Sequence, residues 1–359
     1  MSEIVFILGA GASKEAGAPV MANFLDTADE LRRGGKLGQF SQDFDRVFDA
    51  ISELQAVHSK AQLNLDDIES VFAAFEMGRL TNRLPGIEAN DIEPLLVSIR
   101  RLILKTLEQT VSYPIRSESI FPSPSYHSFA ELVKELSLKG HTCSIITFNY
   151  DYALDYALNF NGIPADYCLP EAKSDGVIPL MKLHGSLNWA RCSKCPEIIP
   201  WNIKDYSRII SLHPLASKRT TSVHLELSTS FSKSGLKHCE VNVDPDPVIV
   251  PPTWNKTEYH QVLSNVWARA ASELSTAENV FVSGYSLNES DLFFRYLFAL
   301  GSVGSTRIKR FWVFNPESEG IVDRRFRGLI GPSTEARYKY IPSQFHDMFN
   351  LISKEFKSL

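Results

Sequence analysis

The stretch that decides the fold stands near the start of the chain and reads Val5-Phe6-Ile7-Leu8-Gly9-Ala10-Gly11-Ala12-Ser13. Its first four residues are apolar and rich in β-branched and aromatic types, which is typical of a buried strand. The small residues that follow let the backbone turn and approach a ligand closely. We expect Ser13 to cap a short helix that runs through Ala16 and stops at Gly17-Ala18-Pro19. Such a strand–turn–helix unit offers backbone N–H groups to a pyrophosphate, although a tight turn without a ligand has the same pattern.

Length and composition limit the classes of protein to consider. The 359 residues suffice for one large domain or two, and 44% apolar with 22% charged residues is ordinary for a soluble globular protein. A net charge of −5 argues against a dedicated nucleic-acid surface, so no direct nucleic-acid binding is expected. No window approaches the roughly 20 apolar residues of a membrane span, and the N-terminus lacks a secretion signal. Five cysteines do not suggest a disulfide framework, so we expect a cytoplasmic protein without a membrane partner.

Helical and strand periodicities alternate along the chain. After a helix over 23–33, a helical insertion over about 36–125 is expected, with a break at Leu84-Pro85-Gly86 and a proline-bearing loop over 112–125. A loop-rich module is expected over about 190–247, after which Val248-Ile249-Val250 resumes the sheet. The remaining elements are predicted helices over 127–138, 152–160, 259–274 and 289–300, and predicted strands over 143–148, 179–183, 279–283 and 310–314.

This alternation predicts an α/β fold with a doubly wound, mostly parallel, Rossmann-like sheet, interrupted by the helical insertion and the small irregular module. Residues 1–320 form one domain in this interpretation, and residues 321–359 are a C-terminal extension packed on it. In such sheets ligands bind outside the carboxyl ends of the strands. Polar clusters follow the predicted strands in five places, namely Gly9–Ser13, Asn149–Asp151, His184-Gly185, Gly284–Ser286 and Asn315. Their positions favour a dinucleotide crevice.

Taken together and in order, these motifs resemble those of the SIR2 superfamily. Residues 9–13 with Gly17-Ala18-Pro19 resemble its glycine-alanine-glycine signature and the following glycine-x-proline, and Thr147-Phe148-Asn149-Tyr150-Asp151 resembles its threonine-glutamine-asparagine-isoleucine-aspartate motif. His184-Gly185 matches the pair that carries the family's active-site base. Gly284-Tyr285-Ser286 stands where the family has glycine-threonine-serine around the NAD phosphates, and Asn315 where it contacts the adenine ribose.

Two departures from the family's pattern lie on the substrate-peptide side and spare the NAD side. Val20-Met21-Ala22-Asn23 replaces a phenylalanine and an arginine, and Val250-Pro251-Pro252-Thr253-Trp254 replaces the glycine-glutamate segment before the acyl-lysine groove. The chain thereby resembles the SIR2-like branch of bacterial antiviral defence systems, which act by abortive infection and hydrolyse NAD. That resemblance implies NAD as substrate, a homo-oligomer, and a protein partner encoded nearby, either a motor ATPase or a short Argonaute-type protein.

The resemblance assigns catalysis to Asn149 and His184. Cleavage of the nicotinamide–ribose bond passes through an oxocarbenium-like state, in which Asn149 can bind a ribose hydroxyl or position water, although an Asn there also suits a helix cap. His184 is the candidate general base, because its unperturbed pKa of about 6.5 lies near the operating pH. Asp151 can orient the carboxamide or act as a first-turn acid. The NAD contacts implied by the resemblance are Gly9, Ala10, Gly11, Ala12, Ser13, Pro19, Thr147, Asp151, Gly284, Ser286 and Asn315.

Three functions remain open. The first is an NAD⁺ glycohydrolase that releases nicotinamide and ADP-ribose, the second an NAD-dependent protein-lysine deacylase, and the third a non-catalytic nucleotide-sensing or assembly module. The altered peptide side favours hydrolysis over deacylation. The presence of both Asn149 and His184 favours an enzyme over a binding module, because a module that only binds has less need of a base.

Two further features admit two interpretations each. Cys192-x-x-Cys195 has zinc-ligand spacing and His238-Cys239 can complete a tetrahedral site, but 44 residues separate Cys195 from Cys239 where ribbons have about 15–20. We therefore favour free thiols over a structural zinc and expect no catalytic metal. The helical insertion has apolar faces, which either pack into the core or are left over for a second copy or a partner. These faces include Phe44, Phe48, Phe72 and Phe75.

Overall fold

A computed structural model describes residues 2–57, 63–117, 119–169, 176–201, 221–227, 235–244, 246–250, 257–288 and 291–357. Within these residues the chain builds a seven-stranded sheet in the order β16-β15-β14-β1-β4-β6-β5, and each neighbouring pair is parallel. The predicted α/β fold with a doubly wound parallel sheet is thus confirmed. The strands are β1 (Glu3–Leu8), β4 (Thr142–Thr147), β5 (Ala165–Asp166), β6 (Ile178–Lys182), β14 (Asn279–Ser283), β15 (Arg310–Phe314) and β16 (Tyr338–Ile341).

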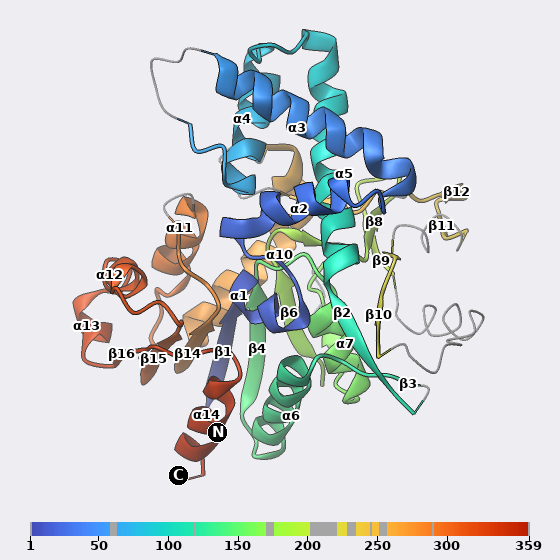
Figure 1. Ribbon diagram of the computed structural model, residues 1–359. Coiled ribbons are helices and arrows are strands. Elements are labelled where there is room, and N and C mark those ends of the chain that lie inside the picture. Colours follow the sequence, from blue (N-terminus) through green and yellow to red (C-terminus); the bar gives the residue numbers. More distant parts are fainter. Residues whose placement is uncertain are drawn as a thin grey trace.

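Helices cover both faces of this sheet, as Figure 1 shows. Strand β1 is buried on both sides: Phe6 packs into one hydrophobic cluster and Val5 and Ile7 into the other, each at most 1% exposed. Continuous apolar runs of this kind are typical of parallel strands that are covered twice. One face is covered by α6 (Pro124–Leu138), α7 (Ala153–Phe160) and α14 (Asp347–Glu355), and the other by α10 (Thr257–Thr276), α11 (Leu292–Gly301) and α12 (Ile321–Arg327).

The strand order reverses beside β1. From β1 the chain adds β4 and β6 on one side of it, and it later returns to add β14, β15 and β16 on the other side. At such a switch point the chain leaves the two central strands toward opposite sides of the sheet, and ligands bind in the crevice outside its carboxyl edge. The loops concerned follow β1 and β14, and they contain the Gly9–Ser13 and Gly284–Ser286 clusters.

The helical insertion lies at this carboxyl edge, at the top of Figure 1. It comprises α3 (Ser41–Ala56), α4 (Ile68–Thr81) and α5 (Ile92–Thr110), preceded by α2 (Phe24–Arg33). Phe44, Phe72 and Phe75 are at most 1% exposed and belong to the main hydrophobic cluster. These three aromatic side chains therefore serve the protein's own core, and Phe48 is partly buried against the same cluster. Assembly through a face of the insertion that is left over stays a prediction.

Two segments differ from the sequence prediction. The expected loop over 112–125 contains β2 (Ser112–Arg116), which pairs with β3 (Ser119–Ile120) and with β10 (Ser222–His224), and its last residues already belong to α6, because Pro124 suits a first helical turn. The expected strand at 248–250 does not join the central sheet. It is β13 (Val248–Ile249), which pairs antiparallel with β7 (Gly185–Ser186) after His184.

The remaining elements are short. They are α1 (Ala10–Ser13), α13 (Pro332–Glu335), the 3₁₀ helices η1 (Lys14–Ala16), η2 (Met21–Asn23), η3 (Gly38–Phe40) and η4 (Ala89–Asp91), and the strands β8 (Trp189–Arg191), β9 (Ile198–Pro200), β11 (Lys237–His238) and β12 (Val241–Asn242). Much of the predicted loop-rich module, at 202–220, 228–234 and 245, lies outside the described residues. In the described part of the chain, no helix is both long and apolar enough to span a membrane.

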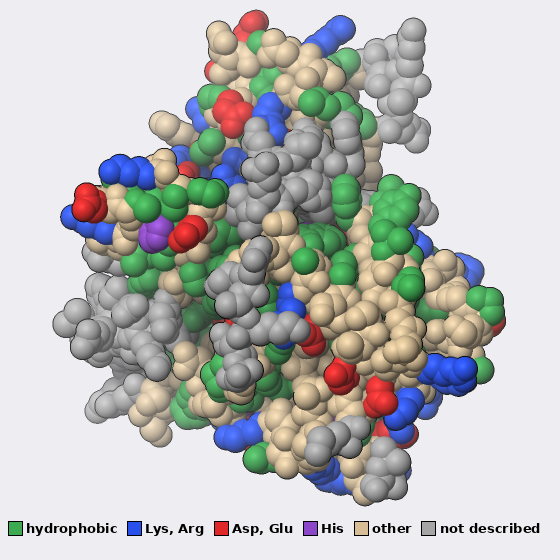
Figure 2. Space-filling model, turned by 180° about the vertical axis from the view of Figure 1, so that it is seen from behind, with side chains coloured by type: hydrophobic (Ala, Val, Ile, Leu, Met, Phe, Trp, Pro, Cys, Tyr) green, Lys and Arg blue, Asp and Glu red, His purple; other side chains and the backbone are tan. Residues whose placement is uncertain are grey.

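An apolar stripe runs along the exposed face of α11. Leu292, Tyr296 and Leu300 lie at helical spacing on α11 and are between 53% and 75% exposed, and Val303, just after the end of the helix, is 75% exposed. Figure 2 shows hydrophobic side chains gathered over this helix. The opposite side of α11, with Phe294 and Phe298, is buried against the sheet, so the helix is apolar on both faces.

Candidate functional site

The turn after β1 and the turn after β14 pack directly against each other. Gly9 N–H donates to Ser283 O at 3.1 Å, and Gly11 N–H donates to Gly284 O at 2.8 Å. A Cβ on Gly11 would lie 2.8 Å from Gly284 Cα, and a Cβ on Gly284, whose φ is +64°, would lie 2.2 Å from Ala12 N. The glycines are thus required by the close approach of the two loops, before any ligand is considered.

The backbone of α1 is partly occupied by these contacts. Besides Gly11, Ala12 N–H donates to Gly9 O at 2.9 Å. The ring of free N–H groups expected from the sequence is therefore smaller than the motif suggested. Ser13 makes no side-chain cap on the short helix, contrary to expectation, and Gly17 ends the following turn with φ of +98°. The Ser13 hydroxyl has tertiary partners instead.

A crevice of about 610 Å³ opens at this edge of the sheet, within the size range of ligand pockets. A narrower, mostly apolar inner pocket of about 40 Å³ adjoins it. Of the residues selected from the sequence, the inner pocket is lined by Ser13, Pro19 and Asp151, while Ala12 and Thr147 line neither. The crevice is lined by Gly9, Ala10, Gly11, Asn149, His184, Gly284, Ser286 and Asn315, of which Ala10 and Asn149 also line the inner pocket.

Asn149 is fixed by a buried network. Its Nδ2 donates to Gly9 O at 2.9 Å, to Ser13 Oγ at 2.9 Å and to Tyr126 OH at 3.3 Å. Its backbone N–H donates to Thr147 Oγ1 at 3.1 Å. The amide donors are therefore used inside the protein, and among the described residues none donates to Oδ1. Because the side chain lines both cavities, an acceptor oxygen is the group it offers to a hydroxyl or a water.

Asp151 serves as an internal anchor. Its Oδ2 accepts from Ser13 Oγ at 2.6 Å, and its Oδ1 accepts from Ala153 N–H at 3.0 Å at the start of α7. Burial raises the pKa of this carboxyl, while the charge of Lys182 and the two hydrogen bonds lower it. Lys182 Nζ donates to the backbone oxygen of Asp151 at 2.7 Å and forms an ion pair with Asp155 Oδ2 at 2.9 Å. The side chains of Lys182 and Asp155 are at most 3% exposed.

Tyr126 is a site residue that the sequence reasoning missed. Its hydroxyl lies 2.8 Å from Ser13 Oγ and contacts Asn149, and the side chain is fully buried. Burial, together with the nearby charge of Asp151, raises the pKa of this phenol, so it stays neutral and able to donate. In the sequence, Tyr126 is one apolar position of the amphipathic helix α6, and no local signal separates it from a core tyrosine. Lys182 stood beside the histidine motif but was not chosen.

His184 follows β6 in a turn, where Val250 N–H donates to its carbonyl oxygen at 2.8 Å. The ring is packed edge-on against Phe148 with centroids 5.2 Å apart, lies 6.0 Å from the Tyr150 ring, and lines the crevice. Gly185 has φ of +87°, and a Cβ there would lie 2.1 Å from Val248 O. The histidine-glycine pair is thus explained by the tight packing of β7 on β13, which holds the histidine at the crevice.

The opposite wall comes from the loops after β14 and β15. Asn315 Oδ1 accepts from Glu317 N–H at 3.0 Å, so its side chain forms a turn as well as lining the crevice. Arg325 Nη1 donates to Ser286 O at 3.3 Å and steadies that loop from α12. Tyr285 stacks on Phe148 with ring centroids 4.2 Å apart, which joins this wall to the loop that carries Asn149.

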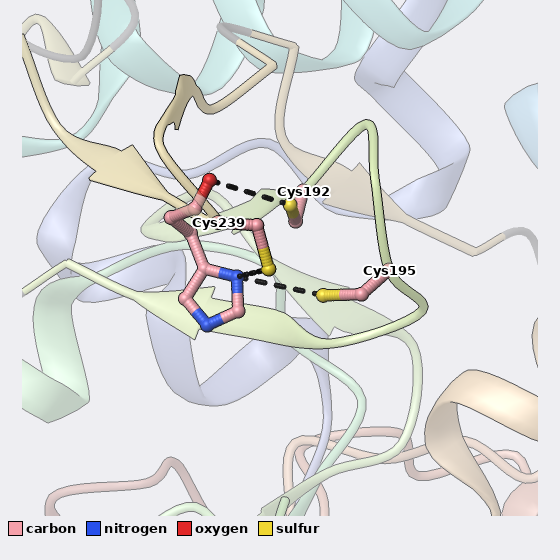
Figure 3. A group of neighbouring side chains, drawn as sticks. Cys192, Cys195 and Cys239 are labelled. Carbon is pink, nitrogen blue, oxygen red and sulfur yellow. Dashed lines mark hydrogen bonds between the residues drawn. The ribbon is translucent and has the colours of Figure 1, made fainter.

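A second cluster lies in the small module, away from the crevice. Cys192, Cys195, His238 and Cys239 place their ligand atoms within 4.8 Å of one another (Figure 3). His238 Nδ1 faces the sulfurs of Cys195 and Cys239, each at 3.4 Å, and its Nε2 lies 3.2 Å from Glu197 Oε2. The 44 residues between the two halves therefore do not keep them apart.

The thiols of this cluster interact with one another. Hydrogen bonding from His238 and from the backbone N–H of Lys194 lowers the pKa of Cys192 to about 6. Hydrogen bonds to Cys195 and Cys192, together with burial, raise the pKa of Cys239 to about 11. These neighbours therefore favour the thiolate form of Cys192 and the thiol form of Cys239.

Comparisons with known proteins gave structural similarity only. No family model matches the chain, and no curated protein matches it. Among solved structures it is similar to a Sir2 homologue in complex with NAD, at 16% identity and a TM-score of 0.44 over 99% of this chain and 89% of that chain. It is also similar to Sir2Tm bound to a propionylated peptide, at 13% identity and a TM-score of 0.42 over 99% and 93%. A mutant Sir2 homologue in complex with 2'-O-acetyl ADP ribose gives 15% identity, coverage of 99% and 92%, and a TM-score of 0.45.

Proposed function

We propose that this protein is an NAD⁺ glycohydrolase that cleaves the nicotinamide–ribose bond and releases nicotinamide and ADP-ribose. The observation that carries the proposal is the state of Asn149: three internal partners hold its amide donors while the side chain lines both the crevice and the inner pocket. A fixed acceptor of this kind suits a ribose hydroxyl or an attacking water. His184, on the same crevice, is the base that takes the proton of that water.

The residues named from the sequence take the supporting roles in this proposal. The loops Gly9–Gly11 and Gly284–Ser286 hold the pyrophosphate, Asn315 binds the adenine ribose, and Pro19 with Asp151 shapes the inner pocket for the nicotinamide. Thr147 acts through its hydrogen bond to the Asn149 backbone.

Protein-lysine deacylation is the second candidate, since it uses the same cofactor pocket. The Pro251–Trp254 part of the segment that replaces the peptide-groove motif lies outside the described residues. The preference for hydrolysis over deacylation thus still rests on the sequence. A non-catalytic module is the third candidate, and the elaborate fixing of Asn149 favours an enzyme over it.

The deciding experiment incubates the purified protein with NAD⁺, with and without an acetyl-lysine peptide, and follows nicotinamide and peptide mass separately. We expect nicotinamide release without peptide and no deacylation. The same assay is run on His184→Ala, which should release no nicotinamide. His346→Ala is its matched control, because His346 is 56% exposed and pairs with Glu15 on the surface. Nicotinamide release that depends on the peptide would establish the deacylase instead.

The biological setting is part of the same proposal. A permanently active NAD hydrolase would deplete its own cell, so we propose a cytoplasmic antiphage effector that is held in check by self-assembly or by a partner encoded nearby. A motor ATPase and a short Argonaute-type protein are the partners implied by the resemblance. To test this control, mass by light scattering and NAD turnover are measured across a dilution series. The series is repeated with the protein encoded by the neighbouring gene. A monomer of constant activity that ignores the neighbour would contradict it.

We further propose a structural zinc ion at Cys192, Cys195, His238 and Cys239. Three thiolates and one imidazole within 4.8 Å match the ligand types, number and spacing of a tetrahedral zinc site. Glu197 at His238 Nε2 provides the carboxylate that orients a metal-binding histidine. Cys239 and Glu240 have φ of +48° and +64°, which costs on the order of 1–3 kcal/mol each, and metal binding would offset that strain. Bound zinc would fasten β8 and β9 to β11 and β12.

Metal analysis of the purified protein tests this site without reference to activity. We expect about one zinc per chain, and we expect Cys195→Ser to lose it. Cys143→Ser is the control, since Cys143 lies on β4 in the core and outside the cluster. Wild-type protein that contains no zinc after expression in zinc-supplemented medium would favour free thiols.

A further inference from the structure

Glu69 stands at the second position of α4, the insertion helix nearest the crevice. Asp67 caps this helix, because its side chain accepts from Glu69 N–H at 2.8 Å. On either side of Glu69 in the helix, Ile68 and Phe72 are at most 3% exposed and anchor the first turn in the core. The backbone that carries the Glu69 carboxylate is therefore fixed relative to the sheet.

The Glu69 side chain lies where the two cavities meet. Six residues line both the crevice and the inner pocket, and they are Ala10, Met21, Glu69, Phe148, Asn149 and Tyr150. Glu69 is the carboxylate of this set. Because Asn149 belongs to the same set, a ligand that fills this junction can contact both the Asn149 amide and the Glu69 carboxylate.

The Glu69 carboxylate acts electrostatically on two tyrosines that line the crevice, Tyr150 and Tyr285. Burial is the main cause that raises the pKa values of Tyr150 and Tyr285. The carboxylates of Asp291 and Glu69 raise both further, and Asp291 has the larger effect on Tyr285. Charges that face buried, apolar surroundings are screened less than charges in water. The Glu69 carboxylate therefore has a field that extends across the junction.

We infer that Glu69 is a catalytic carboxylate that the helical insertion contributes to the NAD site, where it stabilises positive charge on the nicotinamide riboside. The inference rests on the proposed function and extends it. As the bond between ribose C1′ and the pyridinium nitrogen breaks, its electron pair neutralises the nitrogen and C1′ becomes electron-poor. Water then forms the new C1′–O bond and gives its proton to His184. Glu69 forms no bond; it lowers the energy of the electron-poor state through its fixed charge.

This role gives the insertion a direct link to the chemistry. Helix α4 packs against α5, so this pair of helices sets the position of the carboxylate. The crevice is thus lined by a charged group from the insertion as well as by the loops of the sheet.

The test compares Glu69→Gln with Glu93→Gln. Glu93 is the matched control, because it is also the second residue of an insertion helix, α5, but is exposed and lines neither cavity. We expect Glu69→Gln to lower kcat on the order of 100-fold, as for the loss of one preorganised electrostatic group, and to raise KM by a smaller factor because the carboxylate also attracts the cationic nicotinamide before the bond breaks. Glu93→Gln should keep wild-type turnover, and Glu69→Asp should recover part of the loss.

A binding measurement separates this inference from the proposed function. In the His184→Ala background, calorimetry gives the affinities for NAD⁺, whose nicotinamide is cationic, and for NADH, whose ring is neutral. Glu69→Gln should weaken NAD⁺ binding and leave NADH binding unchanged. If Glu69→Gln weakens only NAD⁺ binding but the wild-type protein releases no nicotinamide, the role of Glu69 is supported and the hydrolase is overturned. An active wild type in which Glu69→Gln matches Glu93→Gln in both turnover and binding would overturn the role of Glu69 and leave the hydrolase standing.

Discussion

Replacing Lys182 by methionine tests the buried charges beneath the candidate site. Lys182 Nζ bonds Asp155 Oδ2 at 2.9 Å and Asp151 O at 2.7 Å, and the lysine side chain is 1% exposed. Methionine fills similar volume but leaves two buried carboxyl groups without their cation. Removing one partner of a buried pair costs about 3–5 kcal/mol. We expect the free energy of unfolding, from urea titrations at pH 7, to fall by that amount.

The loss should depend on pH. Burial raises the pKa of Asp151 in the folded protein above its unfolded value of about 3.9. The stability contributed by the protonated Asp151 carboxyl is therefore complete below that unfolded pKa and is lost as the pH rises through the folded pKa. Lys182 lowers the folded pKa, and its removal raises that pKa further. The difference in unfolding free energy between wild type and Lys182→Met should therefore be smaller at pH 4 than at pH 7.

Lys139→Met provides the control, because Lys139 pairs with Glu135 at 3.0 Å with both side chains about one-third exposed. Such a pair contributes about 0–1 kcal/mol. A loss at Lys182 no larger than that at Lys139, or a loss that is equal at pH 4 and pH 7, would refute the assignment of a buried, charge-compensating role.

Four other substitutions probe the site. His184→Ala should abolish NAD cleavage with the fold intact by circular dichroism, and full activity in the folded variant would exclude the histidine as base. Asn149→Ala should lower turnover far more than NAD⁺ affinity in calorimetry, since one hydrogen bond is worth about 0.5–1.5 kcal/mol in binding. Gly11→Val should abolish NAD⁺ binding and lower the melting temperature, because its side chain would displace the Gly284 loop; a stable variant with wild-type affinity would refute this. Tyr126→Phe should lower kcat about tenfold at unchanged KM by releasing the Asn149 amide, and unchanged kcat would show that the remaining partners suffice.

The sequence was most informative where local chemistry dictates the structure. The apolar run before Gly9 can only be a buried strand, and its place before a glycine turn predicted both the parallel sheet and the crevice edge. It was least informative about partners distant in the chain. Nothing near Pro114 indicates that this strand pairs with Ser222, and the apolar run at Val248 does not reveal which sheet it joins.

The same limit applies within the candidate site. A serine in the first turn of a helix is commonly a cap, yet the Ser13 hydroxyl bonds Asp151 and Tyr126, which tertiary structure brings to it. The spacing rule for zinc ribbons disfavoured Cys195 with Cys239, because it counts residues along the chain. The fold brings them together from two separate hairpins, β8–β9 and β11–β12, and that proximity cannot be read from the residue count.

The packing of the Gly9–Ala12 turn on Gly284 has a consequence for synthesis. The first glycine loop is made some 270 residues before the backbone that supports it, and that backbone is itself held by a hydrogen bond from Gly284 N–H to Phe314 O. A nascent chain lacks the side of the crevice that the loop after β14 forms until nearly all of the sheet has been made. A chain that ends before Gly284 therefore has no complete crevice, and whatever chemistry the crevice supports cannot begin before the sheet is nearly complete.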